Sequence, residues 1–343
     1  MFIKSLSLIV TAVLLLSLRT AGNCESLGQG EGYLTSPDGT RIFYKVVGNG
    51  PDHLVVVHGG PGNTLQSILP DLEPLVKGRT VIYYDQRGNG RSDLVEDHKL
   101  LTIAKHIEDL EAIRQHFNLD KMTLLGNSWG GLLVAFYAIA HPNEVERLIL
   151  HSPASPSYTI LKTSTPFIYQ RIPKKSMSQF QSMSVAWIWR SSHDPLSFCR
   201  RFYELLQPVY FSDVARVERM QGDVCAGPIE AVRRQLTVNK VIWESLGEWD
   251  LIPELGALEI PTLVIHGSYD MIPIESSIAW TEAMPNARLL VIQDSGHMTH
   301  IEQPDIFFPA VEKFLHGGWP DEALRIPGDK NETSQPRIDV NRP

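Results

Sequence analysis

The sequence has little positive charge and no basic run. Its 343 residues include 31 Lys and Arg against 39 Asp and Glu, which gives a formal net charge of −8 at pH 7. Nucleic acids and anionic membrane surfaces attract basic patches, so we expect neither as a partner. Heptad arrays and internal repeats are also absent. With 43% hydrophobic and 20% charged residues, the composition is that of a soluble enzyme with a sizeable core.

Cysteine is scarce, with three residues in the whole chain. No Cys/His cluster has the spacing of a metal site, so we expect no bound metal. Three cysteines leave one unpaired in any disulfide scheme. Cys199 and Cys225 fall in the same segment and could form a bridge in an oxidising compartment, or both could remain buried thiols.

The N-terminus carries an uncharged, mostly apolar stretch (5–18) directly after the basic residue Lys4. The stretch is short for a transmembrane helix, which needs about 20 apolar residues. Small residues then precede a cleavage position after Gly22. We therefore expect a signal peptide over 1–22, a secreted or periplasmic protein, and no stable membrane span. A retained anchor or a lipid attached at Cys24 is the alternative.

The most informative motif is Gly-Asn-Ser-Trp-Gly at 126–130. It lies between an apolar run typical of a buried strand (122–125) and a run typical of a helix (131–140). In that context G-x-S-x-G forms a tight turn that strains the serine backbone and requires small flanking residues. The pattern predicts that Ser128 is a nucleophile exposed at the start of a helix.

Two later apolar runs, each typical of a buried strand, end just before candidate partners of Ser128. Asp270 follows the first run and His297 follows the second. The order Ser, Asp, His is the order of the triad in hydrolases with this turn, and the carboxyl ends of parallel strands share one edge of a sheet. We predict that His297 is the general base and Asp270 orients it. Asp294 is a rival acid, but it lies on the loop of His297 and is typical of a solvated residue.

A glycine-rich segment, His58-Gly59-Gly60-Pro61-Gly62, follows another apolar run (54–57). Glycines let a backbone pass close to a substrate, where amide groups can stabilise a developing oxyanion. The predicted donors are the amides of Gly60 and of Trp129, the residue after the nucleophile. His58 precedes the glycines, and we interpret it as an anchor of the loop.

The segment 85–92, which is rich in polar residues and glycine, follows the next apolar run. Asp85 and Arg87 could brace the neighbouring oxyanion loop, and we interpret their role as structural.

The order of the predicted elements indicates an α/β fold with a mostly parallel sheet flanked by helices. A hairpin over 32–47 precedes the alternating strands and helices. After the sixth core strand the pattern becomes helical and aromatic, which predicts a cap over the serine that excludes water. The predicted parts are a signal peptide (1–22), the first part of the core (23–154), the cap (155–250), the second part of the core (251–317) and a disordered tail (318–343).

Aromatic residues are concentrated in the predicted cap. Most are expected to form the cap's own small core, and one or two to line the pocket. The set comprises Trp187, Trp189, Phe198, Phe202, Tyr203, Tyr210, Phe211 and Trp243.

Four segments together resemble the proline iminopeptidase branch of the α/β-hydrolases: 58–62, 85–92, 126–131 and 296–304. The resemblance extends over residues 32–316 and is strongest outside the cap. It implies an α/β-hydrolase fold and an aminopeptidase that removes an N-terminal residue, often proline. The implied route is a serine acyl-enzyme, which requires no cofactor and no metal.

One departure from that branch concerns the free amino group of the substrate. Members hold it with acidic residues, whose positions correspond here to Asn239 and Met271. A buried cationic amine without a carboxylate is poorly stabilised. Cap glutamates could substitute, although each is more typical of a solvated helix face; they are Glu204, Glu218, Glu230 and Glu244.

Three functions therefore remain open. The first is an exported aminopeptidase of the proline iminopeptidase type, and the second is an esterase or amidase that requires no free amine. The substrate would be a small peptide or a small ester or amide. The third is a non-catalytic binding protein on a hydrolase scaffold, against which the complete triad and oxyanion loop argue. A serine in place of an aspartate at 128 disfavours dehalogenases and epoxide hydrolases.

Overall fold

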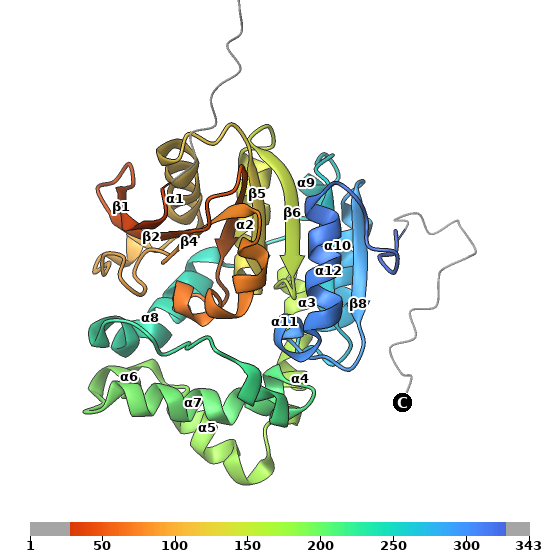
Figure 1. The fold of residues 1–343 in the computed structure, drawn as a ribbon. Helices are drawn as coiled ribbons and strands as arrows, with labels where there is room; N and C mark the ends of the chain where they lie inside the picture. The colour runs from red at the N-terminus through yellow and green to blue at the C-terminus, as the bar shows by residue number, and fades with distance from the viewer. Residues whose placement is uncertain (1–27, 327–343) are drawn as a thin grey trace, which may run out of the picture.

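The computed structural model describes residues 28–326 and contains one sheet of eight strands in the order β1-β2-β4-β3-β5-β6-β7-β8 (Figure 1). The predicted signal peptide, Cys24 and residues 327–343 lie outside the described residues. The strands are β1 (Gly30–Thr35), β2 (Arg41–Val47), β3 (Asp52–Val57), β4 (Arg79–Tyr84), β5 (Met122–Asn127), β6 (Val145–His151), β7 (Thr262–Gly267) and β8 (Ala287–Ile292).

The sheet is mostly parallel, as predicted. β1 and β2 form the expected hairpin, β2 pairs antiparallel with β4, and all the other pairs are parallel. Strands β4 and β7 are buried at every position, because helices cover both faces of a parallel sheet. The chain runs from β3 outward to β4 and then crosses back to β5. The strand order therefore reverses between β3 and β5, where open α/β sheets bind their ligands.

Helices cover the two faces of the sheet and form two separate cores. Alternate residues of β3 point to opposite sides: Val55 and Val57 belong to one core and Leu54 and Val56 to the other. The first core contains residues of α1 (Ile103–His116), α2 (Trp129–Ala140) and α10 (Ile274–Ala283). The second contains residues of α12 (Pro304–Leu315) and the 3-10 helices η1 (Leu65–Ser67) and η2 (Pro70–Val76). Short helices η3 (His98–Leu100), α9 (Ile252–Leu255) and α11 (Thr299–Glu302) complete this part.

The segment between β6 and β7 forms a helical layer at the carboxyl ends of the strands (Figure 1). It contains α3 (Tyr158–Lys162), α4 (Ser164–Arg171), η4 (Lys174–Ser176), α5 (Met177–Met183), α6 (Ala186–Ser191), α7 (Pro195–Tyr210), η5 (Val214–Arg219) and α8 (Ile229–Leu246). An antiparallel bridge between Ser157 and Asp250 joins its two ends. Cys199 and Cys225 form a disulfide across Cα atoms 5.9 Å apart, which decides between the two states that the sequence left open.

The start of the predicted disordered tail is instead folded. Leu324 forms an antiparallel bridge with Leu289 of β8, and Ala323 is buried in the core beside α12. Trp319 packs against Phe314, with ring centroids 5.0 Å apart. These apolar contacts explain why the start of the tail is folded although disorder was predicted. The prediction rested on the mostly polar composition of the tail, in which the few core residues gave no signal. No helix among residues 28–326 is long and apolar enough to span a membrane.

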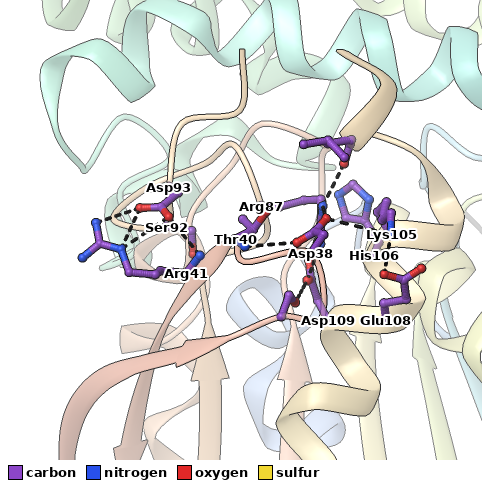
Figure 2. Close-up of polar contacts among 12 residues, drawn as sticks. Asp38, Thr40, Arg41, Arg87, Ser92, Asp93, Lys105, His106, Glu108 and Asp109 are labelled. Atoms are coloured by element: carbon purple, nitrogen blue, oxygen red, sulfur yellow. Dashed lines mark hydrogen bonds and ion pairs between the residues drawn. The ribbon is translucent and has the colours of Figure 1, made fainter. Parts of the chain in front are cut away.

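A buried arginine joins the hairpin to the rest of the core (Figure 2). The guanidinium of Arg87 is fully buried and binds Asp109 of α1 at 2.6 Å and Asp38 of the β1–β2 turn at 2.8 Å. Burial alone would raise the pKa of Asp38, but the hydrogen bonds from Arg87 and Thr40 and the charge of Arg87 together outweigh this effect and lower the pKa to about 2. Arg87 thus braces the hairpin and α1, and the prediction that it supports the oxyanion loop is wrong.

Replacing Arg87 by methionine should lower the free energy of unfolding by roughly 3–5 kcal/mol, because it leaves the Asp109 carboxylate buried without its cation. Urea unfolding measures the change. Arg41→Met is the matched control, since Arg41 forms a solvent-exposed ion pair with Asp93 in the same region (Figure 2) and its loss should change stability little. Equal losses for the two variants would contradict the assignment.

Candidate active site

Ser128 occupies the sharp turn between β5 and α2, with φ 55° and ψ −118°. A residue other than glycine adopts such a positive φ only with backbone strain, which the packing around the turn must impose. The surroundings also explain the flanking glycines. A Cβ on Gly126 would collide with the backbone of Gly130, and a Cβ on Gly130 would collide with the carbonyl oxygen of Val57 in β3. The strained turn predicted from the sequence is present.

His297 and Asp270 lie together beyond the ends of β8 and β7. The His297 Nδ1 is 2.8 Å from the Asp270 Oδ1, and both side chains are almost completely buried. The same Oδ1 accepts a hydrogen bond of 2.9 Å from the amide of Ile272. Burial would raise the pKa of Asp270, but the interactions with His297, with His266 and with the amide of Ile272 together outweigh it and hold the pKa well below its usual value. Asp270 therefore stays ionised and keeps a proton on Nδ1, which leaves the Nε2 of His297 free to act as a base.

The rival acid, Asp294, is exposed and does not pair with His297. Its carbonyl oxygen accepts hydrogen bonds from the Ser212 hydroxyl at 3.1 Å and from the Gln303 side chain at 3.2 Å. The interpretation of Asp294 as a solvated loop residue is thus in agreement with its position.

Ser128 and His297 line the same cavity, which has a volume of about 480 Å³ and lies between the helical layer and the sheet. Most of its wall is apolar, and α7 contributes much of it. The apolar side chains of the wall include Phe180, Phe202, Leu206, Leu236 and Met271. Such a mostly apolar wall suits an apolar group of a ligand.

The glycine-rich loop after β3 passes directly over Ser128. A Cβ on Gly59 would lie 3.1 Å from the Cβ of Ser128, and Gly60 has a positive φ of 44°. A hydrogen bond of 2.9 Å from the amide of Asn63 to the carbonyl of Gly60 closes the turn. On the other side, Trp129 begins α2, so its amide lies at a helix N-terminus, which favours negative charge.

Gln86 connects the side chain of Trp129 to His58 at the start of the glycine-rich loop, and sequence reasoning missed it. Its Oε1 accepts a hydrogen bond of 2.9 Å from the indole of Trp129, and its Nε2 donates one of 2.9 Å to the carbonyl of His58. The Gln86 amide also donates to the His58 Nε2 at 3.2 Å. Burial lowers the pKa of His58 to about 4, so the neutral ring donates from Nδ1 to the carbonyl of Gly59. His58 is thus a loop anchor, as interpreted.

Asp85 braces the segment just after the oxyanion loop. Its Oδ1 accepts from the amide of Leu65 and its Oδ2 from the amide of Arg91, both at 2.7 Å. Burial raises the pKa of Asp85 to about 6 despite these bonds. Both residues therefore have the expected structural role, but only Asp85 acts beside the oxyanion loop, whereas Arg87 braces the hairpin and α1.

The helical layer is hydrogen-bonded to the oxyanion loop. Asn63 Oδ1 accepts from the hydroxyl of Tyr203 in α7 and from Gln235 in α8, both at 2.9 Å. Asn239, also in α8, donates to the carbonyl of Pro61 at 2.9 Å. Asn239 is one of the two positions where the proline iminopeptidase branch has an acid, and here its amide nitrogen holds the loop.

Among the residues that the structure describes, none of the four cap glutamates adds a buried carboxylate to the wall of the cavity. Glu204 lines it, but its side chain is 53% exposed and pairs with Arg201 at 2.9 Å. Glu230 and Glu244 form ion pairs on exposed helix faces, with Arg233 and Lys240, and Glu218 is outside the lining. Asp223 also lines the cavity and is 45% exposed, 3.8 Å from Arg200.

More aromatic residues line the cavity than the one or two expected. Of the eight named from the sequence, the lining contains Phe202, Tyr203, Tyr210 and Phe211. The reason is that α7 runs along the cavity, so that residues along much of its length reach the lining. Trp189 and Phe198 do pack in the core of the helical layer, and Trp243 packs against Trp129. In the part of the chain that the structure covers, no group of three or more His, Cys, Asp or Glu could hold a metal.

A family model described as the alpha/beta hydrolase fold matches residues 52–217 and 227–304. The proline iminopeptidase of Heyndrickxia coagulans is 28% identical over 295 residues, which cover 83% of this chain and 98% of the relative. That of Saccharolobus solfataricus is 29% identical over 291 residues, 81% of this chain and 89% of the relative. The crystal structure of the Mycobacterium smegmatis proline iminopeptidase has a TM-score of 0.62 and 23% identity, with 84% of this chain and 98% of that one covered.

The buried neutral state of His58 makes a testable prediction about acid stability. Burial lowers the pKa of His58 from the ordinary 6.5 to about 4 in the folded protein, so on acidification the unfolded chain is protonated first. The contribution of the neutral ring to the free energy of unfolding is therefore complete above pH 6.5 and is lost as the pH falls through about 4. For His58 alone the loss amounts to roughly 3 kcal/mol. We expect urea unfolding of His58→Asn to depend less on pH between 7 and 4 than unfolding of the wild type. An identical pH dependence in both proteins would contradict the buried neutral state.

Proposed function

Because the chain belongs to the α/β-hydrolase family, we propose that it is a serine hydrolase that cleaves a small amide or ester through an acyl-enzyme. Ser128 is the nucleophile, His297 the general base and Asp270 the residue that orients the base. One observation carries the proposal: the same cavity is lined by Ser128, whose backbone is strained, and by His297, which is bound to Asp270.

The proposed reaction has two similar halves. His297 Nε2 takes the proton of Ser128 as its Oγ attacks the carbonyl carbon, and the amides of Gly60 and Trp129 stabilise the oxyanion. The imidazolium then gives the proton to the leaving amine or alcohol. Water, deprotonated by His297, attacks the acyl-enzyme and releases Ser128 and the acid. Each step uses protein groups and water, so the mechanism requires no cofactor.

The first candidate activity is that of an aminopeptidase of the proline iminopeptidase type, which acts on small peptides. Two relatives of that name support it, since they match over more than four fifths of this chain. The same loops that carry the likeness in sequence, around Gly60 and Ser128, form the catalytic side of the cavity.

The second candidate is an esterase or amidase that does not require a free amine, and the lining of the cavity favours it. The side chain of Asn239 is bound to the oxyanion loop, and Met271 is apolar. The lining carboxylates, Glu204 and Asp223, are half-exposed and lie beside arginines. A cationic amine brought to Ser128 would lose its hydration without gaining a buried anion.

Export is also part of the proposal. A disulfide between Cys199 and Cys225 suits a secreted or periplasmic enzyme, because cytosolic thiols are kept reduced. A signal peptide over 1–22 would direct this export, and attachment of a lipid at Cys24 is the less favoured route.

A panel of three substrates separates the candidates: a proline arylamide, its N-acetylated counterpart and a short p-nitrophenyl ester. An aminopeptidase should prefer the free-amine arylamide, whereas an esterase or amidase should be indifferent to the amine. Either activity should vanish in Ser128→Ala. Absence of turnover on all three by the wild type would favour a binding protein on a hydrolase scaffold.

The orienting role of Asp270 makes a separate prediction. Asp270→Asn keeps the shape of the side chain but favours the wrong tautomer of His297, so kcat should fall by roughly 10⁴ while KM changes little. Steady-state kinetics on the best substrate of the panel measure both constants. A kcat within tenfold of the wild-type value would contradict the assignment.

A further inference from the structure

Another buried histidine, His151, lies behind the site at the end of β6 and has no place in the proposed reaction. Its side chain is fully buried, and its ring nitrogens reach toward both catalytic loops. Nδ1 is 3.2 Å from the side-chain nitrogen of Asn127, the residue before Ser128. Nε2 is 2.8 Å from the hydroxyl of Thr299, two residues after His297. The ring thus bridges the loop of the nucleophile and the loop of the base.

The direction of these hydrogen bonds follows from the groups involved. An amide nitrogen only donates, so Nδ1 of His151 accepts from Asn127 and the ring proton lies on Nε2. The Asn127 nitrogen is also 3.4 Å from the carbonyl oxygen of His151, a contact that suits a donor. Nε2 therefore donates to Thr299. The chain of bonds runs from Asn127 through the ring to the first turn of α11.

The surroundings of His151 keep the ring neutral, which this pattern requires. Burial is the main cause that holds the pKa of His151 well below its usual value. The nearby His300 and His297 also lower this pKa, whereas Asp270 raises it. The ring packs against Phe307 and His300, with centroids 4.8 Å and 4.9 Å away. A protonated Nδ1 would face the donor of Asn127 without an acceptor.

We propose that His151 is a positioning residue that holds the loop of His297 in place relative to Ser128. The inference rests on the proposed function, because it concerns the geometry between the same nucleophile and base. Ser128 follows β5 and His297 follows β8, and two strands lie between them in the sheet. The backbone of His151 contributes as well, since its carbonyl accepts the amide of Ser128 at 2.9 Å.

Such a bridge affects the rate more than the binding of substrate. The substrate cavity contains Asn127, Ser128 and His297, whereas His151 and Thr299 lie outside its lining. Loss of the bond from His151 to Thr299 would let the base loop shift, and a shift of about 1 Å at the reacting groups can cost roughly a hundredfold in rate.

Thr299→Val tests the bridge with little change of shape, because it replaces the hydroxyl by a methyl group. The readout is covalent labelling of Ser128 by a fluorophosphonate probe, which needs the nucleophile and its base but no particular substrate. We expect the maximal labelling rate to fall roughly tenfold to a hundredfold and the concentration for half-maximal rate to stay unchanged. Thr299→Ser, which keeps the acceptor, should restore the rate.

Ser277→Ala is the matched control. Ser277 of α10 forms a similarly buried bond of 2.9 Å to His266 at the end of β7, but this pair does not bridge the loops of Ser128 and His297. We expect Ser277→Ala to lose stability and to keep the wild-type labelling rate.

The outcomes separate the two proposals. Wild-type labelling at Ser128 together with an unchanged rate in Thr299→Val overturns the role of His151 and leaves the proposed function standing. Equal loss of rate in Thr299→Val and Ser277→Ala also overturns it, since the effect would then be general destabilisation. Failure of the wild type to label at Ser128 overturns the proposed function and this inference with it.

Discussion

The close approach of the turn at Ser128 to the end of β3 is the constraint on which the rest of the site depends. With a side chain on Gly130, the turn would collide with the carbonyl of Val57. The loop with Gly59 and Gly60 begins directly after Val57, so the same close approach brings Gly59 against the strained Ser128. The proposed nucleophile and the proposed oxyanion donors are therefore positioned by one backbone packing, at the point where the strand order reverses.

The helical layer does more than cover this point. Asn63 and Pro61 of the oxyanion loop are hydrogen-bonded to α7 and α8, and the disulfide from Cys199 to Cys225 fixes α7 to the segment before α8. Gln86 and His58 thus hold the loop from the side of the sheet, and amide and hydroxyl groups of α7 and α8 hold it from the side of the helical layer. This arrangement uses polar groups of the cap to stabilise the loop and leaves the cavity with mostly apolar walls.

The sequence predicted the fold, and the places of Ser128, Asp270 and His297 in it, because these features leave local signals. Strand runs, the glycines around Ser128 and the strand-end positions of Asp270 and His297 are all readable within a few residues. Gln86, Asn63 and His151 were missed because their roles arise from partners far away in the chain, such as Gln86 with Trp129 and His151 with Thr299. Arg87 was misassigned for the same reason, since its partners Asp38 and Asp109 could not be identified before the hairpin and α1 were placed.

The proposed reaction passes through a covalent acyl-enzyme on Ser128, and this intermediate can be trapped. The wild-type protein would be mixed with p-nitrophenyl butyrate, quenched in acid within its first turnover, digested and analysed by mass spectrometry. We expect a butyryl group on the peptide that contains Ser128, and none in Ser128→Ala. Turnover of the ester without any acyl group on Ser128, or with the group on another residue, would contradict it.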